Sequence, residues 1–450
     1  MSSTSETTTQ ADATAGTRPP TRQLLSGVVG MMLEMYDWQV FGFMAVYVAG
    51  QLFDPADPFA GLLNALLVFA VGFVMRPIGG ALIGAYSDKF GRKSGMILGM
   101  YLLGAGSLVI ALIPSYAQIG AAAGFILVAA RIIQGLGVGG EQGAAVSFLS
   151  EIAPPGKRAM YNALGYIASS VAVLFAVLLA AVLPMLIGQE AMATWGWRIP
   201  FLLGALFTVF AVVMRRTMTE TQLFTEAKQV NTERRSALTV LLTRYWKQSL
   251  ITMLLISGST FAYYVFVLQY ATYANIVTGI QLSQAQMLTA LVIVVFAALQ
   301  PLFAWVSDRV GRRRVLLFSV LGVLVTSWPA LFWVSADPAV VIGLQMLVVI
   351  PAAAGASVSN AALAELFPTE VRAVGVAFPY AIAVALFGGT APYVMTWLGG
   401  QGLILPLALY GSVLCVFSLI AVLLMPDRAK EALHTEAIST SAGAGAAASY

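Results

Sequence analysis

Long apolar stretches separated by short polar ones dominate this chain. Asp, Glu, Lys and Arg are all missing from Gln248 to Ser307, Val315 to Ala336, Ala339 to Ala364 and Ala373 to Pro426. About 20 apolar helical residues cross the hydrocarbon core of a bilayer, so each stretch has room for one or two membrane-spanning helices. The pattern predicts an all-α polytopic membrane protein.

Breaks at Pro, Gly and charged clusters divide the chain into twelve predicted transmembrane helices. These helices cover approximately residues 24–50, 60–86, 94–113, 118–150, 159–185, 197–215, 248–276, 283–306, 315–335, 339–364, 373–398 and 402–425. They form two halves of six helices, residues 23–215 and 248–426, and a cytoplasmic linker at 216–247 joins the halves. The polar ends of the chain, residues 1–22 and 427–450, are predicted to be disordered tails.

A charged motif occurs twice, once in each predicted half. Residues 84–93 have the sequence GAYSDKFGRK, and residues 304–313, which begin 220 residues later, have AWVSDRVGRR. A second motif, Glu-x-x-Pro-x-x-x-Arg, begins at Glu151 and again at Glu365. Duplicated apolar halves with matching charged loops are typical of secondary transporters, whose substrate site lies between the repeats near the bilayer midplane.

Composition and charge agree with a membrane protein and give its orientation. Hydrophobic residues make up 59% of the chain and charged residues only 10%, whereas a soluble domain carries about 25% charged residues. All but three of the 24 Lys and Arg residues fall in the tails or in loops on the side of the repeated motifs. By the positive-inside rule that side, with both chain ends, faces the cytoplasm. The net charge of +4 therefore belongs to loops beside anionic lipid, and nucleic-acid binding is not expected.

Five charged side chains lie inside the predicted spans of the first half, away from the span ends: Glu34, Asp37, Arg76, Arg131 and Glu141. Such groups are costly at bilayer depth unless they are paired or solvated, so by default they mark a functional site. The alternative is that they only tie the first six helices together. Leu and Gly would pack those helices without the desolvation cost, and we therefore interpret the five residues as functional.

Spacing places these five residues in two layers. At about 1.5 Å per helical residue, Asp37 and Arg131 lie farther out, whereas Glu34, Arg76 and Glu141 lie nearer the cytoplasm. A carboxylate that can hold either a proton or an Arg partner acts as a switch, so Asp37, Arg131, Glu34 and Glu141 are the candidates for proton coupling. Arg76 and Arg131 are the candidates for bidentate binding of a substrate carboxylate.

The predicted spans of the second half contain only uncharged polar groups. Because a site between two repeats takes contacts from both, we expect some of these groups to bind the substrate together with the arginines. The candidates are Tyr264, Gln269, Tyr273 and Asn360. For each tyrosine the alternative is a packing or interfacial role.

Residues that would support other chemistry are scarce. Cys415 is the only cysteine, and His434, the only histidine, lies in the polar tail. No disulfide, cysteine-based metal site or intramembrane histidine is therefore available, and we expect no metal, no cofactor and no enzymatic activity. Residues 135–140 match the dinucleotide pattern G-x-G-x-x-G, but they lie within a predicted span without a βαβ unit. Close helix packing through small residues explains them better.

The chain resembles the major facilitator superfamily and, within it, the metabolite:proton symporters. The resemblance rests on the repeated loop motif and on further motifs in matching order over nearly the whole chain, tails excepted. These motifs are Leu33-Glu34-Met35-Tyr36-Asp37 followed by Phe41-Gly42, Arg76-Pro77-Ile78-Gly79-Gly80, residues 131–141 (RIIQGLGVGGE) and residues 195–201 (WGWRIPF). The family includes carriers of α-ketoglutarate, citrate, shikimate and related acids, and of proline and betaine.

The resemblance implies that Asp37 and Arg131 form a proton-coupling pair. It also implies a cytoplasmic latch that holds the halves together when the substrate site faces outward. The latch residues would be Asp88, Arg92, Glu151 and Arg158 in the first half and Asp308, Arg312, Glu365 and Arg372 in the second. The chain departs from the family pattern at Ala304, where a glycine is usual, and at Trp38-Gln39, where a Phe and a small residue are commoner. The second departure bears on the size or identity of the substrate.

We therefore predict a proton-coupled symporter of a small mono-, di- or tricarboxylate that works by alternating access. We expect it to act as a monomer in the bacterial plasma membrane, with the substrate, the proton and the lipid bilayer as its partners. A symporter of zwitterions such as betaine or proline is the first alternative, and an exporter is the second. A receptor-like or purely structural membrane protein would not need five intramembrane charges.

Overall fold

A computed structural model of the chain describes residues 21–90, 92–138, 156–216, 237–368 and 371–426, with a few isolated positions between 146 and 153. Within these residues every regular element is a helix. Nine of the described helices are long and apolar enough to cross a membrane, and a pair bent by 48°, Gln189–Gly196 with Arg198–Val213, makes a tenth. The prediction of an all-α polytopic membrane fold is confirmed.

The first half is built from six long segments and two short helices at its loops. They are α1 (Thr21–Leu52), α2 (Pro58–Phe90), α3 (Arg92–Leu112), α4 (Tyr116–Ile119), α5 (Ala122–Val138), α7 (Arg158–Ile187), α8 (Gln189–Ala191) with the π-helical turn η1 (Met192–Gly196), and α9 (Arg198–Arg216). Each long segment overlaps one of the six predicted spans of this half, although the end of the span predicted at 118–150 lies largely outside the described residues.

The second half follows a stretch that the sequence assigned to the linker, although residues 237–244 of that stretch are helical. Its elements are α11 (Ala237–Arg244), α12 (Trp246–Ala262), η2 (Tyr263–Leu268), α13 (Tyr270–Thr278), α14 (Leu282–Val310), α15 (Arg312–Phe332), α16 (Pro338–Leu366), α17 (Arg372–Ala383), η3 (Val384–Gly388), α18 (Ala391–Gly400) and α19 (Ile404–Leu424). The π-helical turns η2 and η3 interrupt the spans predicted at 248–276 and 373–398. Such turns are rare and occur often at functional sites.

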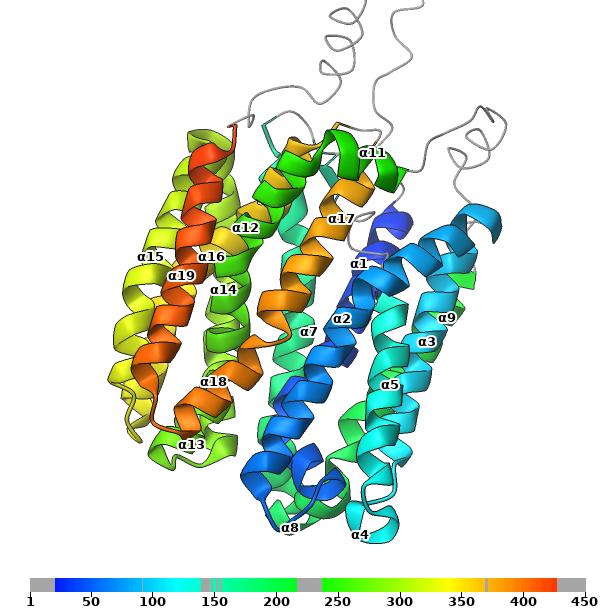
Figure 1. Ribbon diagram of the computed structural model, residues 1–450, viewed down its shortest axis with the longest axis vertical. Helices are drawn as coiled ribbons and strands as arrows, with labels where there is room; N and C mark the ends of the chain where they lie inside the picture. The colour runs from blue at the N-terminus through cyan, green and yellow to red at the C-terminus, as the bar shows by residue number, and fades with distance from the viewer. Residues whose placement is uncertain are drawn as a thin grey trace, which may run out of the picture.

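The two groups of helices stand side by side, with α7 and α14 in contact between them (Figure 1). The start of α1 and the end of α19 lie at one face of the bundle, which we call the basic face because the helix ends at Arg309, Arg312 and Arg372 also lie there. At the opposite face α1 and α2 pack against α13 and α18 through apolar side chains. This opposite-face seal consists of Ala45, Ala49, Leu62, Ala65 and Leu66, covered by Val46, Phe53, Ile276 and Tyr393.

Large apolar side chains cover the outward surface of the helices. On α14, for example, Leu291, Val294, Leu302 and Trp305 recur at helical spacing, and each is 44% to 52% exposed. A water-soluble protein does not expose apolar surface on this scale, whereas lipid tails solvate it without penalty. The exposed surface is therefore that of a protein embedded in a bilayer.

Glycines allow α5 to lie close against α2 and α3. A Cβ atom on Gly135 would overlap the carbonyl oxygen of Gly72 and lie 2.8 Å from the Cβ of Met75, and one on Gly137 would lie 2.5 Å from the carbonyl oxygen of Gly99. The helix backbones touch at these points, as in small-residue interfaces of other membrane helices. This packing accounts for the two described glycines of the G-x-G-x-x-G pattern.

We expect Gly135→Ala to destabilise the protein, because the added methyl group must push α5 away from α2. Overpacking of this kind costs about 1–3 kcal/mol. The same change at Gly50, on α1, adds a methyl group with no atom within 4 Å and should be neutral or slightly stabilising, since Ala favours a helix over Gly. Thermal unfolding of the two purified variants in detergent tests this. Equal thermal unfolding midpoints for Gly135→Ala and Gly50→Ala would contradict the close contact between α2 and α5.

Candidate functional site

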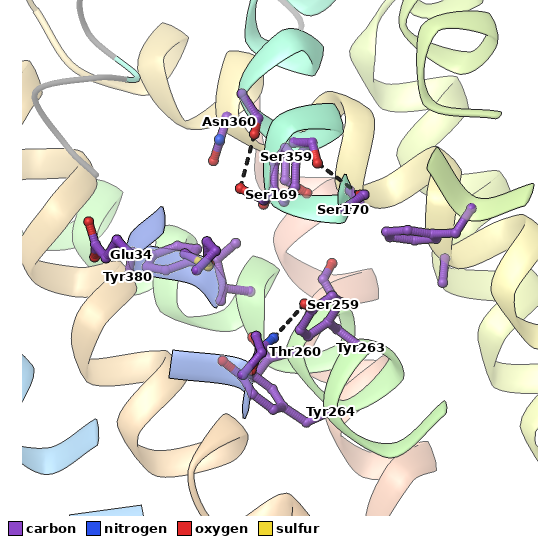
Figure 2. A pocket seen from close by; sticks show the side chains of 18 of the residues that line it. Glu34, Ser169, Ser170, Ser259, Thr260, Tyr263, Tyr264, Ser359, Asn360 and Tyr380 are labelled. Carbon is purple, nitrogen blue, oxygen red and sulfur yellow. Dashed lines mark hydrogen bonds between the residues drawn. The ribbon is translucent and has the colours of Figure 1, made fainter. Parts of the chain in front are cut away.

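A cavity of about 100 Å³ lies between the two halves (Figure 2). It would hold several water molecules, since one water needs roughly 10–15 Å³ measured in the same way. Its lining comes from α1, α2 and α7 of the first half and from α12, η2, α14, α16 and α17 of the second. The polar residues on it are Glu34, Gln39, Arg76, Tyr166, Ser169, Ser170, Ser259, Thr260, Tyr263, Tyr264, Ser359, Asn360 and Tyr380. A small polar ligand would therefore touch both halves.

Arg76 is a buried cation on this lining that forms no hydrogen bond with any described residue. Its side chain is only 6% exposed, and its Nε and Nη2 atoms have no partner. The guanidinium lies over two aromatic rings, 3.9 Å from the ring centroid of Trp38 and 4.6 Å from that of Phe73. These contacts stabilise the cation partly. Its hydrogen-bonding capacity remains available to a ligand in the cavity.

Asp37 lies away from the cavity lining, in a buried polar cluster of the first half. Ser107 donates a hydrogen bond to its Oδ1, and Nε2 of Gln134 donates to its Oδ2 at 3.1 Å. Nη1 of Arg131 donates to Oε1 of the same Gln134 at 2.8 Å. The predicted partners Asp37 and Arg131 are thus joined through the amide of Gln134, and no ion pair within 4.0 Å links them directly. Gly204 of α9 leaves just enough room for the carboxylate, because a Cβ there would overlap Oδ1.

Trp38 connects this cluster to the cavity. Its ring centroid is 3.9 Å from the guanidinium carbon of Arg76 and 4.2 Å from that of Arg131. Trp38 is 1% exposed, and its Nε1 has no hydrogen-bond partner among the described residues. One indole ring therefore contacts both buried cations, one of which lines the cavity while the other reaches toward Asp37.

Charged residues link the halves at the basic face. Glu365 accepts from Nη2 of Arg312 at 3.1 Å and pairs with Nη1 of Arg158 at 3.5 Å. Arg312 also pairs with Asp308 at 2.6 Å, and Asp308 accepts the backbone N–H groups of Ala159 and Met160 at 3.1 Å each. The carboxylate of Asp308 thus lies at the start of α7, where the helix dipole favours negative charge. We call this cluster, Arg158, Asp308, Arg312 and Glu365, the ionic network.

The remaining latch candidates take other positions. Arg372 donates from Nε to the carbonyl oxygens of Ala364 and Phe367, at 3.0 and 3.2 Å. Glu151 lies outside the described residues, as does Glu141, a candidate for proton coupling. The backbones of Asp88 and Arg92 are helical, but their side chains also lie outside the described part. Four of the eight predicted latch residues therefore meet in the ionic network.

The structure places three of the six predicted substrate-binding residues on the cavity: Arg76, Tyr264 and Asn360. It does not place Arg131, Gln269 or Tyr273 there. Arg131 is fully buried against the rings of Trp38, Phe41 and Phe69. The hydroxyl of Tyr273 donates to the carbonyl oxygen of Leu331 at 2.7 Å, and Gln269 accepts from Thr272 at 3.4 Å.

Several residues of the site carry no charge and were not selected from the sequence. Gln134 and Ser107 complete the Asp37 cluster, and Trp38 separates that cluster from the cavity. Gln39 donates to the hydroxyl of Tyr263 at 2.5 Å and so links α1 to η2 across the halves. In the sequence, one signal that pointed to these residues was the departure of Trp38-Gln39 from the family pattern. The position of Gln134, one helical turn after Arg131, could have added a second.

Comparison with known proteins agrees with this architecture. The model of the Major Facilitator Superfamily matches residues 27–281 and 261–445. A citrate-proton symporter of Klebsiella pneumoniae is 35% identical over 369 residues, which are 82% of this chain and 83% of the relative. The alpha-ketoglutarate permease of Escherichia coli K12 is 33% identical over 432 residues, 94% of this chain and 99% of the relative. Transporters named for betaine, proline or ectoine are also among the relatives, at 28% to 30% identity.

A solved structure with the same fold is that of the proton:xylose symporter XylE of E. coli bound to 6-bromo-6-deoxy-D-glucose. It matches with a TM-score of 0.70 over 93% of this chain and 98% of that chain, at 20% sequence identity. At that identity the match shows the fold alone.

We expect Glu365→Gln to loosen the contact between the halves at the basic face, because Arg158 and Arg312 would share a neutral amide in place of a carboxylate. Breaking a buried ion pair from one side costs about 3–5 kcal/mol. The effect is measured as the distance between spin labels on Tyr86→Cys (α2) and Leu242→Cys (α11), both exposed positions. The native Cys415 is buried and should not be labelled.

The distances in the Glu365→Gln protein should shift to longer values than in the unmodified background. Glu190→Gln, which neutralises an exposed acid near the opposite face, serves as the matched control. Identical distance distributions in the two variants would exclude a role for Glu365 in closing this face.

Proposed function

Because the chain belongs to the major facilitator superfamily, we propose that it carries a small organic acid across the plasma membrane together with a proton. The observation that carries this proposal is the buried guanidinium of Arg76 on a cavity between the halves, without a hydrogen-bond partner among the described residues. The transport step is alternating access of this cavity to the two faces of the membrane. The chain acts as a monomer and needs no cofactor.

The anion binds at Arg76. A planar guanidinium offers parallel N–H donors to a carboxylate, and such charge-assisted bonds are stronger than neutral ones. The protein leaves Nε and Nη2 of Arg76 without acceptors, which costs free energy unless a ligand supplies them. Tyr264 and other hydroxyl groups of the second half then contact the rest of the ligand. This arrangement favours an anionic substrate.

The proton binds at Asp37. Protonation removes a negative charge from the Asp37–Gln134–Arg131 cluster, and the positive charge of Arg131 then acts more strongly on the cavity beyond Trp38. Protonation also removes the repulsion between the Asp37 carboxylate and a bound anion, which at an effective dielectric constant of ~20 is about 1–2 kcal/mol over roughly 8–15 Å. The anion therefore binds best when Asp37 is protonated, and the two travel together.

The two ends of the molecule supply the gates. At the opposite face the seal between α1, α2, α13 and α18 is apolar, whereas the ionic network joins the halves at the basic face. We place the basic face in the cytoplasm, because its loops carry most of the Lys and Arg residues. Transport then requires the two sets of contacts to open in turn.

A zwitterionic substrate is the second candidate. Glu34, Tyr263, Tyr264 and Tyr380 line the cavity beside Arg76, and an acid with aromatic rings is a suitable site for a cationic nitrogen. The relatives named for betaine, proline or ectoine support this alternative. Competition experiments separate the two, because a simple carboxylate lacks the cationic group.

We expect Arg76→Lys to lower pH-driven uptake of the anion in proteoliposomes by at least tenfold, a loss of ~1.4 kcal/mol. An ammonium group cannot reproduce the planar, bidentate fork of a guanidinium. Arg244→Lys, at an exposed position on α11, is the control and should leave uptake unchanged. Small carboxylates should compete for uptake, and sugars should not. Competition by betaine or proline but not by carboxylates would establish the zwitterion alternative.

We expect Asp37→Asn to abolish the accumulation of substrate in vesicles that a pH gradient drives. Exchange of labelled for unlabelled substrate across the membrane should continue. Asn has the size of a protonated Asp and keeps partners in Ser107 and Gln134, but it cannot release a proton. Anion affinity in this variant should stay near the acid-pH value of the unmodified protein and should not change with pH. Asp54→Asn, in an exposed loop, is the matched control. Accumulation at the unmodified level in Asp37→Asn vesicles would remove Asp37 from the mechanism.

A further inference from the structure

Arg76 is the only cation on the cavity lining among the described residues. Glu34 is the one acid that the described part of the chain places on the lining, and it offers no attraction to further carboxylates. The cavity therefore has the charge to bind one carboxylate group, and a second one would lack a cationic partner.

The opposite side of the cavity presents hydrogen-bond acceptors. Figure 2 shows Asn360, Ser359 and Ser169 gathered on one side, away from Tyr264. Ser169 and Ser359 donate their hydroxyl protons to the carbonyl oxygens of Gly165 and Gly355, at 3.0 and 2.7 Å. A serine that donates to its own helix has only lone pairs left for a ligand. These two hydroxyls can therefore accept hydrogen bonds from a ligand, but they repel a carboxylate.

The amide oxygens of two residues on the lining lack hydrogen-bond partners among the described residues. Oδ1 of Asn360, which is 6% exposed, and Oε1 of Gln39, which is 1% exposed, have no hydrogen bond within the described residues. A buried amide without a partner is costly. A hydroxyl both donates and accepts, so it satisfies an amide in either orientation, whereas a carboxylate only accepts.

Arg76 lies at the aromatic side of the same cavity. Its guanidinium contacts Phe73, whose ring centroid is 5.3 Å from that of Tyr264. The cavity thus has a cationic side at Arg76 and an acceptor side at Asn360. We infer that the substrate is a hydroxylated monocarboxylate, whose carboxylate binds Arg76 and whose hydroxyl groups bind Asn360, Ser359 and Ser169. This inference rests on the proposed function and selects among the mono-, di- and tricarboxylates that it admits.

Three acids with the same four-carbon chain test the inference: threonate, a hydroxylated monocarboxylate, butyrate, which lacks the hydroxyls, and tartrate, which has hydroxyls and a second carboxylate. Binding to the purified protein is measured by ligand-induced thermal stabilisation, and uptake is measured in proteoliposomes with a pH gradient. Threonate should bind at least tenfold more tightly than either butyrate or tartrate. Asn360→Leu should erase the advantage of threonate over butyrate.

Asn64→Leu, at an exposed position of α2 outside the cavity, is the matched control and should keep the full preference. The thermal unfolding midpoint of Asn360→Leu without ligand reports whether the variant is folded, and Ser359→Ala, a smaller change, should weaken the binding of threonate more than that of butyrate. Two results would overturn the inference and leave the proposed function intact. One is equal binding of threonate and butyrate. The other is tighter binding of tartrate than of threonate, if Arg76→Lys abolishes the binding of tartrate. Binding of betaine or proline with none of the three acids overturns the proposed function itself.

Discussion

Two arginine side chains buried in the membrane-spanning core set the main constraint on this structure. Removing a guanidinium from water costs several kcal/mol, and the cost is met only by nearby charge, hydrogen bonds or aromatic rings. Arg131 has the charge of Asp37 nearby, one hydrogen bond from Nη1 to Gln134 and the rings of Trp38, Phe41 and Phe69, although its Nε and Nη2 have no partner among the described residues. Arg76 obtains aromatic rings but no hydrogen bond among the described residues. Of the two arginines only Arg76 lines the cavity, so it is the one that can bind a ligand there.

The halves contribute unequally to the site. The first half supplies the intramembrane charges, and the second supplies neutral hydroxyl and amide groups. The π-helical turn η2 carries Tyr263 and Tyr264, two consecutive residues that both line the cavity. In a regular helix, neighbours in sequence point about 100° apart, so the wider turn helps to bring both rings to one side. A duplicated fold has thus acquired different chemistry in its two copies.

Contacts between the halves also differ at the two ends. The apolar side chains of the seal can separate and pack again in many orientations. The ion pairs of the ionic network form only when Arg158 and Arg312 lie within reach of the Glu365 carboxylate. Between the ends, Gln39 bonds to Tyr263, and Gln300 bonds to Ser170 at 3.0 Å. These two hydrogen bonds cross the interface beside the cavity, so a ligand there would lie next to groups that respond to movement of either half.

The sequence by itself determined the architecture. Apolar runs of membrane-spanning length require helices, because the bilayer offers no other partner to backbone N–H and C=O groups. The repeated motifs marked the two halves, and the charges within the spans marked Asp37, Arg76 and Arg131 as worth attention. These inferences depend on residue type and on position along the chain, both of which are visible without a structure.

Only the tertiary structure decided which side chains meet. A helix that is apolar all round gives no sign of which face turns inward, so Gln269 and Tyr273 were as good candidates as Tyr264. Helical spacing also fails across the break at η2, beyond which Tyr273 bonds to Leu331. The link from Asp37 to Arg131 passes through Gln134, and that from Arg131 to Arg76 passes along the ring of Trp38. Such links depend on how α1, α2 and α5 pack, and helix packing in three dimensions is not encoded in the spacing of residues along any one of them.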